Sequence, residues 1–240
     1  MSDLDSPAAE PTRPDPSLLD TDLEYRAAVI DLIAVLAYSE LVAYERLAAD
    51  GALAPTIADK AAIGAMAAAE YRHFVALSEW LRAHGVDPDE AMKPFRGAID
   101  EFHSHTSPSD WLEGLVKAYV GDGIALDFYR QIAKFVDADT YEVVLSVCED
   151  FGQSEFIVEK VRAAVVADPK VGGRLALWGR RLVGEALSQA QRVAAERDAL
   201  ASFIVGGVDR PGADLAEIGR MFASLTEHHT RRMSALGLAA

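Results

Sequence analysis

The sequence predicts an all-α fold, built as an antiparallel bundle of long helices. From Leu18 onward the chain is rich in Ala, Leu, Glu and Arg, and apolar residues recur at three- and four-residue spacing. The alternation of β-branched residues that is typical of strands is missing. Helix-breaking segments leave stretches of about 28 residues, a length that suits a bundle with short connections. We therefore expect one helical domain over residues 18–240.

Glycine, proline and capping residues set the expected helix boundaries. Asp50-Gly51 ends the first long helix, Ser107-Pro108-Ser109 begins the third, and a short helical piece at 89–103 lies between the second and third. The first four long helices form the bundle, and the last two are additional C-terminal helices that cover it or form a homodimer surface. The expected long helices span residues 20–50, 56–84, 108–136, 138–167, 170–205 and 212–236.

The first 17 residues have a different composition. Residues 1–17 carry four prolines among serine and acidic side chains, and such a segment buries too little apolar area to offset its ordering entropy. We expect a disordered leader there. The N-terminus lacks the basic start and apolar run of a signal peptide, and no stretch of about 18 uninterrupted apolar residues follows. A soluble, cytoplasmic protein without membrane contact is expected.

Charge and cysteine content exclude several classes of protein. The formal net charge of -15 argues against a general binder of nucleic acids or anionic membranes. The charge is uneven, because residues 1–168 carry a net charge of -18 and residues 169–240 a net charge of +3. The single cysteine, Cys148, excludes an intramolecular disulfide framework and a cysteine-rich zinc or iron–sulfur site.

Each of the four bundle helices places one acidic residue near mid-length on its apolar stripe. Glu40 shares a stripe with Ile33, Leu36 and Leu47, whereas Glu45 lies about 140° away and is expected to be solvated. In the second helix Glu70 and His73 stand three residues apart, so a carboxylate and an imidazole can face one metal ion. Asp122 in the third helix and Asp150 in the fourth occupy equivalent positions, with Gln153 three residues after Asp150.

A carboxylate on an apolar stripe must be paired, protonated or bound to a metal. A single one is usually a buried salt bridge, and a lone Glu-x-x-His is usually a surface accident. Four acids, one per helix and at a common level of an antiparallel bundle, favour a shared metal site instead.

These residues resemble a known family. Ala69-Glu70-Tyr71-Arg72-His73-Phe74 resembles the Glu-x-x-His-Phe segment of ferritin-like carboxylate-bridged di-iron proteins, specifically the tRNA 2-methylthio-isopentenyladenosine hydroxylase family. The runs Gly121–Phe128 and Asp150–Gln153 fall where that family has acids of its third and fourth helices. The resemblance covers residues 22–167. It implies a ferritin-like four-helix bundle and an iron site with the ligands Glu40, Glu70, His73, Asp122, Asp150 and Gln153.

Three of the six positions depart from the family pattern. Asp122 and Asp150 replace glutamate and have a shorter reach, and the neutral amide of Gln153 replaces a histidine, which is a better iron ligand. We therefore expect one firmly bound iron at Glu40, Glu70 and His73, and a weak, altered or empty second position.

The resemblance implies an oxygen-dependent hydroxylase that takes electrons from a separate donor, since no flavin or nicotinamide motif is present. If tRNA is the substrate, the basic residues after position 168 are the best phosphate contacts available: Arg174, Arg180, Arg181 and Arg192. Two alternatives stay open. One is a bundle with a degenerate metal site that acts as a structural or partner-binding protein, and the other is an iron-oxidising or iron-binding protein.

Overall fold

The structure is a computed structural model that describes residues 13–148, 153–206 and 215–240. These described residues form helices and no strand, which confirms the all-α class. The elements are α1 (Leu18–Thr21), α2 (Leu23–Asp50), η1 (Gly51–Leu53), α3 (Ile57–Ala83), α4 (Pro88–Met92), η2 (Lys93–Phe95), α5 (Arg96–His105), α6 (Trp111–Lys117), η3 (Ala118–Asp122), α7 (Gly123–Ile132), η4 (Ala133–Phe135), α8 (Ala138–Ser146), α9 (Gln153–Ala167), α10 (Pro169–Glu196), α11 (Asp198–Val205) and α12 (Leu215–Ala235).

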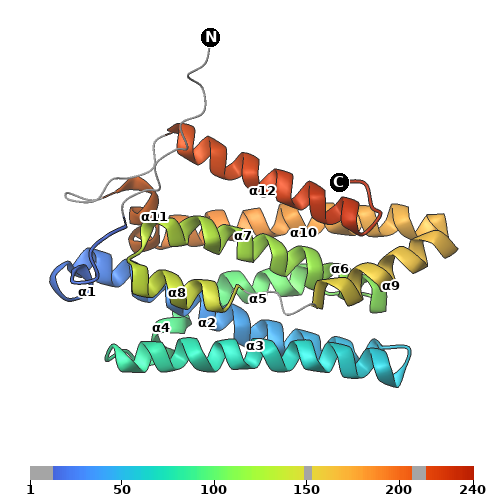
Figure 1. The fold of residues 1–240 in the computed structure, drawn as a ribbon, viewed down its shortest axis with the longest axis horizontal. Coiled ribbons are helices and arrows are strands. Elements are labelled where there is room, and N and C mark those ends of the chain that lie inside the picture. Colours follow the sequence, from blue (N-terminus) through green and yellow to red (C-terminus); the bar gives the residue numbers. More distant parts are fainter. Residues whose placement is uncertain (1–12, 149–152, 207–214) are drawn as a thin grey trace, which may run out of the picture.

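The helices are stacked in layers (Figure 1). The long helices α2 and α3 run side by side, and the short turn η1 between them makes the pair antiparallel. The segment α6–η3–α7 packs with α9 and α10 above that pair, and α12 lies along α7 on the side away from α3 (Figure 1). The C-terminal helices α10, α11 and α12 all pack against the other helices.

Acidic and hydroxyl side chains fix the helix starts. Asp22 accepts the backbone N–H groups of Glu24 and Tyr25 at the start of α2, and Thr56 accepts that of Asp59 at the start of α3. The third helix begins at Trp111 rather than near Pro108, because Asp110 supplies the cap. Boundaries of the first two long helices lie within three residues of their predicted positions.

The buried apolar residues form two clusters that meet around Glu40. One cluster takes the first half of α2, from Tyr25 to Ala37, and the other takes its last turns at Leu47. On α3 the two clusters divide between Met66 and Leu77. The boundary between the two clusters therefore lies at mid-length of α2 and α3, and the polar side chains of Glu40, Glu70 and His73 lie at this boundary.

The fourth predicted helix is not continuous, so the expected single helix 138–167 is wrong. Helix α8 ends at Ser146, and Val147 and Cys148 form a turn and a bend. The carbonyl oxygen of Cys148 accepts a hydrogen bond from the Arg130 guanidinium on α7, which satisfies a group that a longer helix would have paired internally. A partner from another helix thus stabilises the end of α8.

The predicted helix 170–205 is also divided, at Arg197. The backbone of Arg197 is non-helical, and its guanidinium makes two hydrogen bonds of 2.9 and 2.6 Å to the buried carboxylate of Asp31 on α2. This bidentate ion pair joins residues 166 positions apart in the chain. The tertiary contact explains why a sequence with good helix formers on both sides is broken there.

Part of the expected leader is placed against the bundle. Residues 1–12 lie outside the described residues, but Arg13 stacks 3.5 Å above the ring of Tyr141 and donates a 3.2 Å hydrogen bond to the carbonyl of Ala133. This cation–π contact holds the segment that leads into α1.

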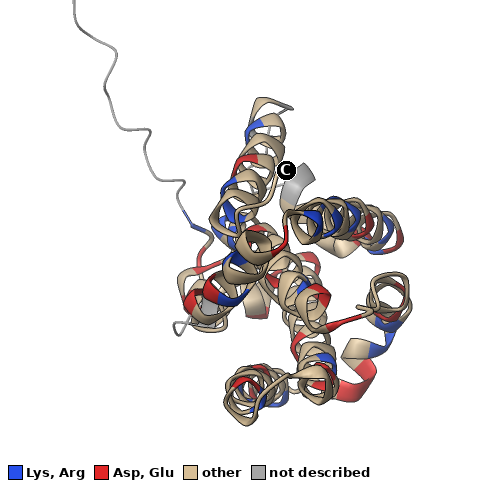
Figure 2. Cartoon of the chain, turned by 90° about the vertical axis from the view of Figure 1, so that its right-hand side faces the viewer, with Lys and Arg blue, Asp and Glu red and all other residues tan. Residues whose placement is uncertain are grey.

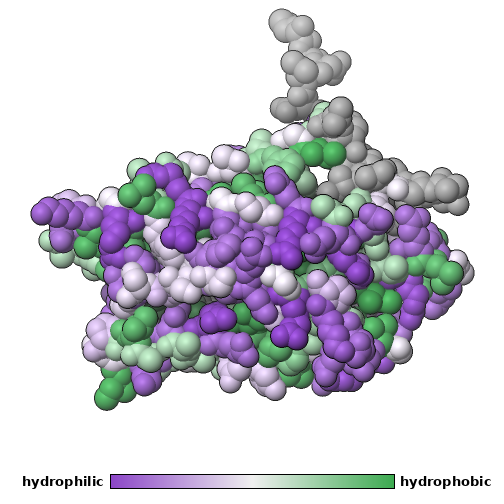
Figure 3. All heavy atoms as spheres, turned by 180° about the vertical axis from the view of Figure 1, so that it is seen from behind, coloured by the Kyte–Doolittle hydropathy of each residue, from purple (hydrophilic) through white to green (hydrophobic). Residues whose placement is uncertain are grey.

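Among the described residues, one helical stretch, Leu23–Leu53, is long and apolar enough to cross a membrane. Its first half forms the centre of the larger core cluster, and the central helix of a soluble bundle has the same composition. The molecular face seen in Figure 3 is mostly hydrophilic, with small and scattered hydrophobic patches. Both observations favour a soluble protein, and the cytoplasmic location stays a prediction.

Candidate metal centre

Glu40, Glu70 and His73 converge in the gap between the two core clusters. The Nδ1 atom of His73 lies 3.2 Å from Oε2 of Glu40 and 3.6 Å from Oε2 of Glu70. One ligand atom from each residue lies within 4.8 Å of the other two. Among the described residues, no other set of three histidine, cysteine, aspartate or glutamate side chains comes this close together. Glu40 is buried, at 5% exposure, and Glu70 and His73 are half-buried.

The pairing of α2 with α3 creates this cluster. Glu70 and His73 are three residues apart on α3 and therefore share one face, which is turned toward α2. Glu40 projects from α2 at the same level, whereas Glu45 is exposed on the opposite side, as its helical angle predicts.

The three side chains shift one another's pKa values. Hydrogen bonds to Glu40 and Glu70 raise the pKa of His73 to about 9. Burial, and then the neighbouring Glu70, raise the pKa of Glu40 well above its ordinary value. Burial also acts to raise the pKa of Glu70, but hydrogen bonds with Glu40 and His73 outweigh it and lower that pKa. At neutral pH the proton on His73 therefore balances part of the negative charge of the cluster.

The three residues fit a transition-metal ion. An ion with metal–ligand distances of about 2.1 Å brings neighbouring ligand atoms to about 3–4 Å from one another. The distances of 3.2 and 3.6 Å agree with this. Two carboxylates and one imidazole suit iron, zinc or manganese. A metal ion would replace the proton on His73 as the compensating charge.

Of the other three predicted ligands, the structure describes the side chain of Asp122 but not those of Asp150 and Gln153. Asp122 lines the same cavity of about 300 Å³, but its carboxylate is not part of the close group of three. Burial, and then the charge of Glu70, raise the pKa of Asp122 well above its ordinary value. Asp150 lies outside the described residues. Gln153 is the first residue of α9, and its side chain also lies outside what the structure describes.

A π-helical turn carries Asp122. The turn, η3, adds a residue to the helical repeat, so the apolar stripe before it is displaced relative to the stripe after it. Asp127, five residues further on, is buried at 4% exposure because His228 and Arg232 of α12 lie against it. A regular helix of 100° per residue, which the sequence argument assumes, places Asp122 on the stripe but not Asp127.

Sequence reasoning missed the ionic cluster around Asp127. Its carboxylate lies 2.6 Å from the guanidinium of Arg232 and 3.2 Å from Nδ1 of His228, both on α12. This part of α12 is not a solvated tail, because the next residue, His229, is buried at 8% exposure. No local pattern in α12 shows that it packs on α7, so only the tertiary structure could reveal this contact.

Two guanidinium groups, those of Arg130 and Arg232, line the metal cavity together with Asp122. Arg232 passes directly over Gly123, where an added Cβ would lie 2.6 Å from its Cδ atom. The side of the cavity around Asp122 therefore already holds cationic groups. This arrangement disfavours a second metal ion there.

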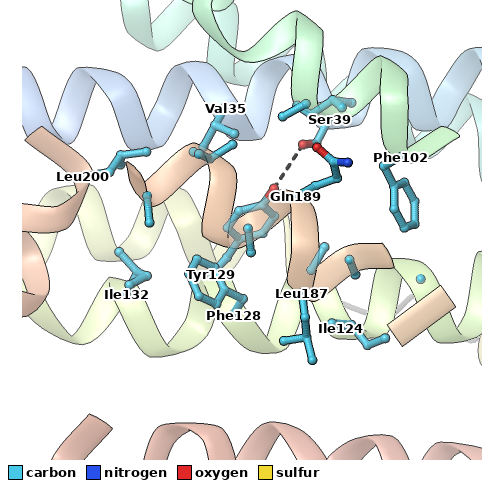
Figure 4. Close-up of a pocket in the computed structure, with 18 of the residues that line it drawn as sticks. Val35, Ser39, Phe102, Ile124, Phe128, Tyr129, Ile132, Leu187, Gln189 and Leu200 are labelled. Atoms are coloured by element: carbon cyan, nitrogen blue, oxygen red, sulfur yellow. Dashed lines mark hydrogen bonds between the residues drawn. The ribbon is translucent and has the colours of Figure 1, made fainter. Parts of the chain in front are cut away.

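Tyr129 and Ser39 form the wall between the metal cavity and a second, apolar cavity. Their hydroxyl groups are 3.0 Å apart and hydrogen-bonded (Figure 4). Burial raises the pKa of Tyr129 far above its ordinary value, so the phenol stays protonated. Burial likewise raises the pKa of Cys148 to about 11, which makes this cysteine a neutral core residue.

The four arginines considered as phosphate contacts all make contacts within the chain. Arg174 pairs with Asp110 at 2.7 Å and with Glu113, and Arg192 pairs with Glu101 and with Glu196. The remaining two, Arg180 and Arg181, donate hydrogen bonds to the carbonyl oxygens of Ala239 and His105. Basic and acidic residues are interleaved on most helices seen in Figure 2.

A comparison with protein families shows which family the chain belongs to. The family described as "Ferritin-like domain, actinomycetes" matches residues 23–207, which is most of the chain. The chain belongs to this ferritin-like family. The match begins with α2 and extends through α11, so it includes the helix pair that carries the Glu40, Glu70 and His73 group. A search of the curated proteins found no match.

The ferritin-like family and the geometry support a metal-binding protein of this superfamily. The match does not extend to the tRNA hydroxylases or to iron as the bound metal. Those two expectations are taken up below as proposals.

Proposed function

We propose that this ferritin-like protein is an oxygen-dependent hydroxylase that binds one iron ion through Glu40, Glu70 and His73. The observation that carries the proposal is the convergence of three ligand atoms within 4.8 Å, in a buried cavity beside an apolar one. Iron held by carboxylates and an imidazole supplies the chemistry that activates dioxygen for insertion of oxygen into a C–H bond.

The surrounding residues have the properties that such a reaction needs. The apolar clusters on both sides keep bulk water away from the centre, which protects reactive species from side reactions. Tyr129 and Ser39 separate the centre from the apolar cavity, so a substrate in that cavity lies next to the ligands without touching them. Arg232, held by Asp127, closes the cavity on the side of α12.

The overall reaction balances with an external reductant. One dioxygen molecule, two electrons and two protons convert a C–H bond into C–OH and release one water molecule. The electrons come from a separate donor protein, since the chain contains no flavin or nicotinamide motif.

The first experiment measures metal content and oxygen use of the full chain. Protein purified without chelator, or loaded anaerobically with Fe(II), is expected to hold close to one iron per chain. With a chemical reductant it should consume dioxygen. Glu70→Ala and His73→Ala should abolish both properties, whereas Glu45→Ala, an exposed change on α2, should alter neither.

Other outcomes would select the alternatives. A chain that binds no metal under any of these conditions would be a bundle with a degenerate site and a structural or partner-binding role. Rapid, repeated oxidation of added Fe(II) without use of an organic reductant would identify an iron-oxidising protein. Either result would overturn the hydroxylase proposal.

A tRNA substrate stays a prediction. If tRNA binds, the net negative chain must rely on residues 169–240, so binding should weaken steeply with salt. Replacing Arg180 and Arg181 together by alanine should weaken it further. A titration of labelled tRNA at low and moderate salt measures this, and no binding at low salt would exclude the nucleic acid.

A further inference from the structure

The metal centre has an apolar neighbour cavity of about 210 Å³. It lies between α2, α5, α7 and α10, and Leu200 of α11 and Leu225 of α12 complete its lining. Aliphatic and aromatic side chains from these helices surround it, as Val35, Ile132, Phe128, Leu187 and others show in Figure 4. The cavity is therefore a partly open space between several helices, rather than an apolar face of a single helix.

Small residues on α10 create the space. Ala186, Ala190 and Ala194 recur every four residues and all line the cavity. Protein interiors are normally close-packed, so an apolar space of this size requires that larger side chains be absent along one wall. The neighbouring Ala195 does not line the cavity and is exposed.

The cavity is long and narrow. Its lining positions on α2 run from Leu32 to Ala43, a rise of about 16 Å along that helix. The wall shared with the metal centre, at Ser39 and Tyr129, lies part-way along the cavity, between Leu200 at one end and Phe102 at the other (Figure 4). A linear ligand in this space presents an interior part of its chain to that wall.

The polar groups in the lining are few: Ser39 and Tyr129, which hydrogen-bond to each other, and the side chains of His103, Asp122 and Gln189. A polypeptide segment has an N–H and a C=O group at nearly every residue, so it would leave most of these groups without partners there. An apolar cavity is also a poor site for water, which needs two to four polar partners. Both considerations favour a ligand made of methylene groups.

We propose that this cavity binds an unbranched hydrocarbon chain of the fatty acyl class, and that this chain is the substrate class of the neighbouring metal centre. The assignment as substrate rests on the hydroxylase function proposed above. The binding itself rests only on the shape and chemistry of the cavity.

The test is a direct binding measurement with the full chain. The probe is cis-parinaric acid, a polyene fatty acid whose fluorescence rises in apolar surroundings, with octanoate, laurate and palmitate as competitors. Saturable binding and displacement by laurate are expected. Ala190→Phe fills the middle of the cavity and should raise the dissociation constant by about tenfold or more. Ala195→Phe, the same change five residues further along α10 and facing solvent, should leave the dissociation constant unchanged.

A second variant keeps the test decisive if Ala190→Phe folds poorly. Leu200→Ala lengthens one end of the cavity and should shift the preference among the three competitors toward the longer chain. Failure to bind the probe, or equal binding by wild type and a folded Ala190→Phe protein, would overturn the proposal. An unchanged chain-length preference in Leu200→Ala would also contradict it.

One further comparison separates this proposal from the metal function. Glu70→Ala should lose metal and still bind the probe with the wild-type dissociation constant. If the probe binds normally but the wild-type protein never holds a metal, the cavity proposal survives as a binding site and the hydroxylase proposal fails. If metal binds but the probe does not, the hydroxylase needs a different substrate class.

Discussion

The metal affinity of the Glu40, Glu70 and His73 centre should rise steeply with pH, because a metal ion must displace protons from it. The pKa of His73 is raised to about 9, so at pH 7 about 99% of this imidazole is protonated. That competition lowers the apparent affinity about a hundredfold at pH 7 and gives a tenfold change per pH unit. The raised pKa of Glu40 adds to the slope wherever that carboxyl is also protonated.

The assay is a titration with Co(II) or Mn(II) between pH 6 and pH 8.5. Calorimetry in two buffers with different protonation enthalpies counts the protons released, and at least the one proton of His73 is expected at pH 7. His73→Gln keeps a polar side chain of similar length but cannot carry the proton, so it should weaken binding and also flatten the pH dependence. An affinity that stays constant from pH 6 to pH 8, or binding without proton release, would refute the reasoning.

The same groups determine how the stability of the metal-free protein depends on pH. Both His73 and Glu40 have folded-state pKa values above their ordinary ones. Their contribution to folding is therefore fully present at low pH and is lost as pH rises, for His73 between about 6.5 and about 9. This amounts to about 3 kcal/mol for His73. The difference in melting temperature between metal-loaded and metal-free protein should consequently grow from pH 6 to pH 8.5.

Three other predictions concern the centre and its supports. Equilibrium dialysis should give close to one tightly bound ion per chain, and two equivalent ions would contradict the cationic character of the second half of the cavity. Gly123→Ala should destabilise the fold by about 1–3 kcal/mol in urea unfolding, because its Cβ would meet Arg232, whereas Gly64→Ala, with open space around it, should be neutral or slightly stabilising. Arg197→Ala leaves Asp31 buried without its partner and should cost about 3 kcal/mol, with Arg197→Lys in between; an unchanged unfolding midpoint would show that the ion pair is not needed.

The sequence was sufficient to predict the helical class and the antiparallel α2–α3 pair, because both depend on local periodicity and on capping residues. The same periodicity indicated that Glu40 faces inward and Glu45 outward. It also placed Glu70 and His73 on one face. Within a regular helix, the angle between two side chains follows from their spacing alone, so three ligands of the candidate site could be proposed before any coordinates.

The regular helix also marks where sequence reasoning ends. The π-helical turn at Asp122 changes the phase of the third helix, and no composition signal announces it. The breaks at Cys148 and Arg197 depend on Arg130 and Asp31, which are distant in the chain. Helix propensity is a local quantity. The free energy of a hydrogen bond or ion pair across the bundle is larger than the difference in helix propensity of one or two residues, so the tertiary contact decides where the helix ends.

By itself, the sequence determined which side chains could hold a metal and how acidic the chain is. Only the tertiary structure decided that α12 packs on α7 and brings Arg232 into the metal cavity, and that the alanines of α10 leave an apolar space beside Tyr129. The physical reason is that a cavity and its counter-charges are properties of several elements packed together. Each helix contributes a face that its own sequence defines, but the partner of that face is chosen by the packing of the whole chain.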